Sequence, residues 1–85
     1  MVLKVSSKSN PNSIAGCISG LIKEEEDVEL QCVGAAATNQ GIKAIIIAKS
    51  FLIASGYELL INPSFNEINI DGIKRTCIRL KLEVK

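Results

Sequence analysis

Residues 36–54 restrict the possible fold more than any other part of this chain. Their apolar side chains recur at helical spacing and form two stripes on adjoining faces, whereas a surface helix needs only one. One stripe consists of Ile42, Ile45, Ile46, Leu52 and Ile53, and the other of Ala44, Ile47, Ala48, Phe51 and Ala54. Such a helix is buried on two sides. We therefore expect a second copy of the chain to cover one side, through Ala44, Ile47 and Phe51.

The length of the chain also favours association. With 85 residues it is expected to fold as one domain, residues 1–85. Small domains bury a limited share of their surface and gain stability from disulfides, metals or association. Cys17, Cys32 and Cys77 are odd in number and widely spaced, and histidine is absent, so we expect buried thiols, no metal and no cofactor. Association is the remaining source of extra stability, so we expect a homo-oligomer, either a dimer or a tetramer.

Charge and hydropathy exclude some classes of partner. The net charge is +1, and five acids lie together between residues 23 and 30, a run that is typical of a solvated helix end. The longest apolar run, residues 42–54, contains Lys43 and Lys49 and is too short to span a membrane. The N-terminal residues alternate like a strand and do not resemble a signal peptide. We expect a soluble, cytoplasmic protein with no membrane partner.

The first half of the chain predicts two strands and two helices. A strand is expected over residues 3–6, and a helix over 11–25 with Pro11 in its first turn and Ser9 or Asn10 as its cap. Negative charge at the end of this helix opposes its dipole, so we expect it to fray near Glu25. A second strand is expected over residues 28–33, followed by the helix over 36–54, which Gly56 closes.

The second half predicts two more strands. One covers residues 57–61 and is broken or bulged around Pro63, because proline cannot donate to a strand ladder. The pattern resumes at residues 68–70, and Asp71-Gly72 predicts a tight hairpin turn before a last strand that ends near residue 84. In that strand Cys77, Arg79 and the following odd-numbered residues share a polar face. The expected class is α/β: β-α-β-α-β-β, a sandwich of a mixed four-stranded sheet and two helices.

The sequence contains no obvious set of catalytic residues. General-base catalysis needs a group that titrates near neutrality and a partner that orients it. Histidine is absent, and the acids are clustered or lie in turns. We therefore expect a non-enzymatic protein with no catalytic residues.

The loop before the first helix is a candidate phosphate site. Lys8 and Ser9 lie in this loop, and Asn12 lies in the first turn, where N–H groups have no partner within the helix. The alternative is a solvated loop with an ordinary helix cap.

Two further segments carry candidate nucleic-acid contacts. Asn39, Gln40 and Lys43 are polar residues near the start of an otherwise apolar helix, and can contact phosphates and bases. The alternative is that the amides serve as caps or are satisfied across a dimer interface. Lys74 and Arg75 follow the hairpin turn and can reach along a nucleic-acid groove. Their alternative role is to discourage aggregation at a strand edge.

The motifs resemble one known family along the whole chain. They are LKVSSKSNPNSIAG (residues 3–16), GAAATNQ (34–40) with Lys43-Ala44, Pro63-Ser64-Phe65, and Ile70-Asp71-Gly72 with Arg75-Thr76. They resemble the stage V sporulation protein S family, which is similar in fold to the Alba chromatin proteins. The resemblance implies a dimerising β-α-β-α-β-β domain. It also implies binding of DNA or RNA through a lysine loop, the start of the second helix and a basic hairpin.

The sequence departs from the Alba pattern in three places. Lys8 stands alone where adjacent lysines are usual, Ala35 follows Gly34 where an arginine is usual, and the hairpin is expected to be a short arm. We therefore expect a non-enzymatic sporulation regulator that binds nucleic acid weakly through a basic surface built by the oligomer. The first alternative is a protein–protein interaction or assembly factor. The second is a small-molecule binder or enzyme that uses the turn at residues 34–40.

Overall fold

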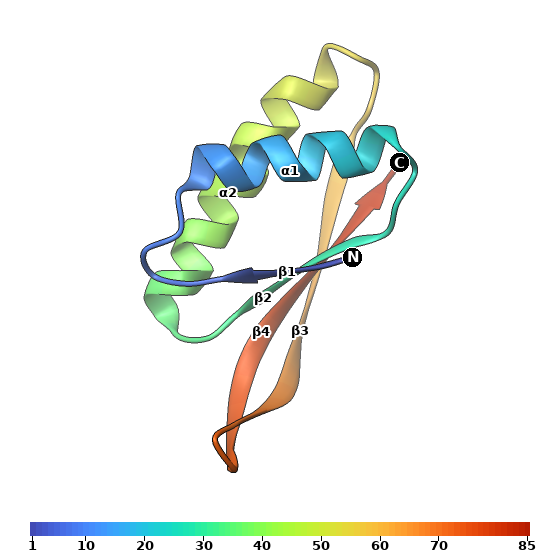
Figure 1. The fold of residues 1–85 in the computed structure, drawn as a ribbon. Coiled ribbons are helices and arrows are strands. Elements are labelled where there is room, and N and C mark those ends of the chain that lie inside the picture. The colour runs from blue at the N-terminus through green and yellow to red at the C-terminus, as the bar shows by residue number, and fades with distance from the viewer.

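Short-range alternation and helical periodicity give six elements along the chain. The computed structural model describes residues 1–85. Its elements are β1 (Val2–Val5), α1 (Pro11–Lys23), β2 (Val28–Cys32), α2 (Ala35–Ile53), β3 (Leu59–Ile70) and β4 (Ile73–Val84). The strands form one mixed sheet in the order β1-β2-β4-β3, parallel between β1 and β2 and antiparallel elsewhere. The predicted α/β architecture is confirmed (Figure 1).

Both helices cover the same face of the sheet. Val28, Leu30 and Cys32 of β2 are buried, whereas Glu29 and Gln31 between them are half-exposed, because successive strand residues point to opposite faces. The buried side chains of β2 join Ile18 of α1 and Ile45, Leu52 and other residues of α2 in one core. We call the other side of the sheet the open face.

Local capping chemistry determines where α1 begins and ends. Asn10 is the cap, and Pro11 follows it at the first helical position. Ser9, the other candidate for the cap, does not cap the helix. Its hydroxyl accepts a hydrogen bond from the backbone N–H of Ser6, at 2.9 Å. The helix ends at Lys23, two residues earlier than predicted, and Glu25 adopts a positive φ of 61°. The run of acids is unfavourable at the negative end of the helix dipole.

The predicted break around Pro63 is wrong. β3 continues from Leu59 to Ile70 without a change of register, and Pro63 pairs with Leu80. β3 is an edge strand that pairs with β4 alone, so the missing N–H of proline is tolerated there. The two-residue Asp71-Gly72 turn is confirmed, with positive φ values of 50° and 79°.

The expectation of a short hairpin is also wrong. β2 pairs with β4 only as far as Ile78, and beyond that point β3 and β4 continue as a two-stranded ribbon. We call this ribbon, residues 66–77, the arm. It projects from the body of the molecule, whose longest dimension is 42 Å (Figure 1).

α2 is buried on one side only. Its buried residues are Ala37, Gly41, Ala44, Ile45, Ala48 and Leu52. Gly41 allows close packing on the sheet, because an added Cβ would lie 3.0 Å from the Cys32 Sγ. Ala44 is fully buried within the subunit, so its assignment to an oligomer interface is wrong. The predicted stripes were divided incorrectly, since Ile45 lies in the core and Ile46 is 60% exposed.

The three thiols occupy different environments. Cys32 and Cys77 are buried, whereas Cys17 is exposed on α1, so the expectation of three buried thiols is wrong for Cys17. Burial raises the pKa of the Cys32 thiol, and the neighbouring Cys77 raises it further. No helix has the length and apolar character needed to cross a bilayer.

Candidate nucleic-acid interface

Gln40 links the first loop to α2. Its side-chain Nε2 donates to the backbone carbonyl of Ser9 at 2.9 Å, and its Oε1 accepts from the Lys43 Nζ at 3.4 Å. Lys8, next to Ser9 in the loop, is exposed, and so is Lys43. The structure therefore brings Lys8, Ser9, Gln40 and Lys43 together. Gln40 therefore has hydrogen-bond partners for its amide nitrogen and its amide oxygen within the subunit.

The start of α1 does not offer free N–H groups. The Asn10 Oδ1 accepts from the backbone N–H of Asn12 at 2.9 Å and from that of Ser13 at 3.4 Å. The carbonyl of Asn10 accepts from Ile14. The N–H groups that were expected to face a phosphate are therefore engaged by an ordinary cap, and binding at Lys8, Ser9 and Asn12 stays a prediction. The Asn12 side chain is exposed.

The start of α2 differs from that of α1. Gly34 is its cap residue, with a φ of 89° that favours glycine, and no side chain caps the helix. The Thr38 hydroxyl donates to the Gly34 carbonyl at 2.9 Å and so leaves the first N–H groups without a side-chain partner. Ala35, Ala36 and Asn39 are exposed here. Asn39 makes no cap, so the capping alternative fails for it.

A hollow of about 630 Å³ lies between the start of α2 and the hairpin. Asn39 and Ile42 line it from α2, and Phe65 and Thr76 line it from the hairpin. Phe65 is 80% exposed, which is unusual for a large apolar side chain. In the sequence Phe65 is only one residue of a motif, and no local pattern gave it a role.

Lys74 and Arg75 are exposed on the arm but point to opposite sides of it. Neighbouring strand residues alternate, so Lys74 shares the helix side with Phe65 and Arg75 shares the open face with Arg79. Lys74 and Arg75 therefore do not form one cluster, and a ligand on one side of the arm meets only one of them. The period of two in β4 already contained this information.

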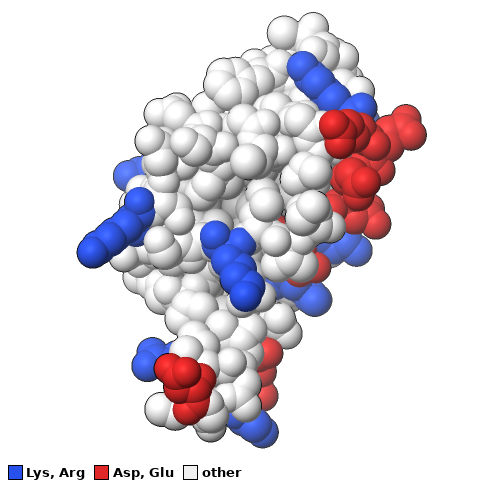
Figure 2. Space-filling view, viewed as in Figure 1, with Lys and Arg blue, Asp and Glu red and all other residues white.

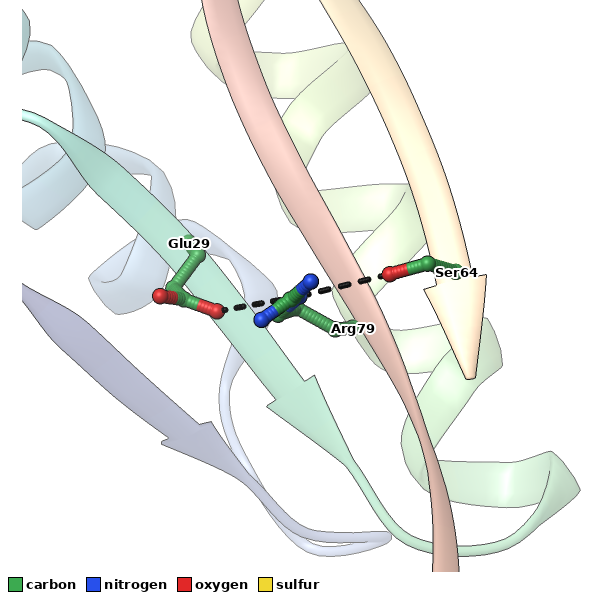
Figure 3. Close-up of polar contacts among 3 residues, drawn as sticks. All are labelled: Glu29, Ser64 and Arg79. Carbon is green, nitrogen blue, oxygen red and sulfur yellow. Dashed lines mark hydrogen bonds and ion pairs between the residues drawn. The ribbon is translucent and has the colours of Figure 1, made fainter. Parts of the chain in front are cut away.

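Arg79 lies over the open face and is partly neutralised. Its Nε is 3.5 Å from a carboxylate oxygen of Glu29 and donates to the Ser64 hydroxyl at 3.3 Å. Figure 3 shows the guanidinium between β2 and β3, with the helices behind the sheet. The sequence predicted that Arg79 and Lys81 share a face, but not this ion pair, because Glu29 is far away in the chain.

The largest group of acidic side chains lies at one end of the molecule, where α1 turns into β2. Further acids, Glu67 and Asp71, lie on the arm, and lysines and arginines are spread singly over the visible face (Figure 2). The first loop, the start of α2 and the arm lie toward the opposite end (Figure 1). No group of three or more His, Cys, Asp or Glu side chains is placed to hold a metal ion.

Comparison with known proteins finds a partial match to a longer protein and a family match over the whole chain. A sorbitol dehydrogenase from Macaca fascicularis is 34% identical over 83 residues, which covers 91% of this chain and 23% of the dehydrogenase. The chain thus spans less than a quarter of that relative. The family described as Stage V sporulation protein S (SpoVS) matches residues 1–85, the whole length, as the motifs in the first loop, the start of α2 and the hairpin predict. The chain belongs to the stage V sporulation protein S family.

Proposed function

We propose that this protein is a non-enzymatic, cytoplasmic regulator that binds nucleic acid weakly and as an oligomer. Family membership implies a sporulation-related role. The observation that carries the proposal is the Ser9–Gln40–Lys43 linkage, which holds the loop with Lys8 against the exposed start of α2. Both lysines lie far from the acidic turn between α1 and β2. An anionic ligand is therefore repelled less at the lysines than at that turn.

The small number of cations explains why binding is weak. Each Lys or Arg that contacts a phosphate releases counterions, and so adds to both the affinity and its salt dependence. Lys8, Lys43 and Lys74 are single charges on this side of the subunit. Two or four subunits on one nucleic acid add their contacts through avidity. Because phosphates carry no sequence information, we expect little sequence preference.

The exposed apolar side of α2 supports association. Ile46, Phe51 and Ile53 are 60%, 50% and 71% exposed on this helix. Ile46 and Ile53 lie two turns apart on one face of the helix and Phe51 lies on another, and large apolar side chains exposed in this number favour a subunit interface. Phe51 remains in the proposed contact, as does Ile47, which is half-buried against the core.

A protein-interaction or assembly role without nucleic acid is the second candidate. The same apolar side of α2 and the near-neutral net charge favour it. Capture of a protein partner that survives nuclease treatment, with no nucleic-acid binding, would support this role instead.

Fluorescence anisotropy with short duplex DNA and duplex RNA at low salt tests the nucleic-acid function. We expect the double variant Lys8→Ala, Lys43→Ala to bind more weakly and to lower the salt slope by about 2 per subunit, because each lysine that binds a phosphate adds about 1 to the slope. The matched control, Lys23→Ala with Lys85→Ala, removes the same charge elsewhere. No binding by the assembled protein, or equal weakening in both double variants, would reject the proposal.

A further inference from the structure

The open face is the more basic side of the sheet. The strand registers assign it four bases and two acids: Lys4, Arg75, Arg79 and Lys81 against Glu29 and Glu83. This sums to +2, whereas the whole chain carries +1, so the remainder of the molecule sums to −1. The candidate contacts on the helix side therefore do not account for most of the positive charge on the sheet.

The centre of this face is polar. Gln31, Arg79 and Ser64 lie side by side across three strands, and Lys81 and Asn62 form part of the next row. Amide, hydroxyl and guanidinium groups all donate to phosphate oxygens. Protein–protein interfaces instead concentrate aromatic and apolar residues at their centre. The two rows named here have none, and the exposed apolar residues of this face, Val2, Leu60, Ile70 and Ile73, lie toward its ends. The composition matches nucleic-acid interfaces, which are more polar and more positive.

The open face is also hollowed. A hollow of about 460 Å³ lies between the ends of β1 and β2, at Lys4 and Gln31, and the arm, at Ile68 and Ile70. Ile68 is paired with Arg75 across the arm, so cationic residues lie on both sides of this hollow. Lys4 is the one cation that lines this hollow, and Arg79 and Arg75 are the strand partners of Gln31 and Ile68 in its lining.

The arm connects this face to the proposed nucleic-acid surface. Lys74 lies on its helix side and Arg75, the next residue, lies on its open side. A polyanion that follows the arm therefore meets one cation on each side, beside Glu67 on the helix side and Asp71 at the tip. We infer that the open face of the sheet is a second phosphate-binding surface, centred on Arg79 and Lys81, over which nucleic acid bound near α2 continues. This inference rests on the proposed function.

Glu29 makes the inference testable by a gain of affinity. The Glu29 carboxylate lies 3.5 Å from the Arg79 Nε, and the side chains of Glu29 and Arg79 are 31% and 42% exposed. The carboxylate therefore competes with a phosphate for the same guanidinium. We expect Glu29→Gln to tighten binding roughly twofold to fivefold at low salt, the range allowed by release of one exposed ion pair. The control Glu24→Gln makes the same charge change in the acidic turn, and screening limits its effect on this face.

A loss-of-charge variant gives the second measurement. Arg79→Ala with Lys81→Ala should weaken binding of duplex DNA and RNA and lower the salt slope by about 2. Lys23→Ala with Lys85→Ala is the matched control, and thermal melting verifies that each variant is folded. Because Glu29→Gln removes no packing group, it remains informative if the double variant is unstable.

The outcomes separate this inference from the function on which it rests. Tighter binding by Glu29→Gln and weaker binding by the Arg79, Lys81 variant would support it. If Lys8→Ala with Lys43→Ala weakens binding while all the open-face variants match the wild type, the inference is overturned and the proposed function stands. No binding by the wild type overturns both. If these variants change the affinity for labelled polyglutamate but not the affinity for nucleic acid, the face binds acidic polypeptide and the inference is wrong.

Discussion

The two helices cover the same face of the sheet, yet their outer surfaces differ. The exposed residues of α1 are small or polar: Asn12, Ser13, Gly16, Cys17, Gly20 and Lys23. The outer side of α2 instead exposes Ile46, Phe51 and Ile53. Asn10 caps α1, whereas no side chain caps α2. A single subunit therefore leaves α2 incomplete, both along its outer side and at its start, whereas on α1 the buried Ser19 hydroxyl is the group without a hydrogen-bond partner.

This difference assigns separate roles to the two helices. Full burial of a large apolar side chain stabilises the folded state by about 1.5–3 kcal/mol. The exposed apolar residues of α2 would contribute this stabilisation only when a partner covers them. The outer side of α1 has little to gain from a partner. We therefore expect changes on α2 to affect assembly, and equivalent changes on α1 to be tolerated.

The largest expected effect is loss of the oligomer in Ile46→Glu. Burying a carboxylate in an apolar contact is very unfavourable, so the subunits should separate. Sedimentation or light scattering measures the mass, and Ser13→Glu on α1 is the control with the same added charge. An Ile46→Glu protein with the mass of the wild-type assembly would contradict our interpretation of α2. Ile46 is a better probe than Ile47, which also packs against the core.

The next effect concerns stability and compares two adjacent residues of α2. Ile45 is fully buried, and Ile46 is 60% exposed. We expect Ile45→Ala to lower the free energy of unfolding by about 2–5 kcal/mol. Ile46→Ala should change it by less than about 0.5 kcal/mol in a single subunit. Urea denaturation in a Phe51→Glu background, which we expect to be monomeric, measures both. Equal losses of stability would remove the contrast between the two sides of the helix.

Features determined by neighbouring residues could be predicted from the sequence. The order of elements, the Asp71-Gly72 turn and the position of Pro11 in α1 follow from local patterns. The resemblance assigns both the loop with Lys8 and the helix start with Lys43 to nucleic-acid binding, and the Gln40 hydrogen bonds join these two segments. These hydrogen bonds join residues distant in sequence, so no local signal indicated them.

Features that depend on pairing between distant strands could not be predicted. Pro63 suggested a break, but its effect depends on whether β3 is an edge strand, which only the strand order decides. The length of the arm follows from the same unbroken pairing. Ala44 was assigned to an interface because helical periodicity alone does not say which apolar side faces the sheet. The Glu29–Arg79 ion pair likewise requires the register of β2 on β4.

The smallest expected effect tests the two helix starts. Asn10→Ala should cost about 1 kcal/mol of stability, because the N–H groups of Asn12 and Ser13 lose their acceptor. Its affinity for nucleic acid and its salt slope should match those of the wild type, since this helix start is engaged with its own cap and not with phosphate. Lys8→Ala should show the reverse, with weaker binding and unchanged stability. If Asn10→Ala altered the salt slope of a fully folded protein, the start of α1 would belong to the binding surface, and the proposed division between the helices would not hold.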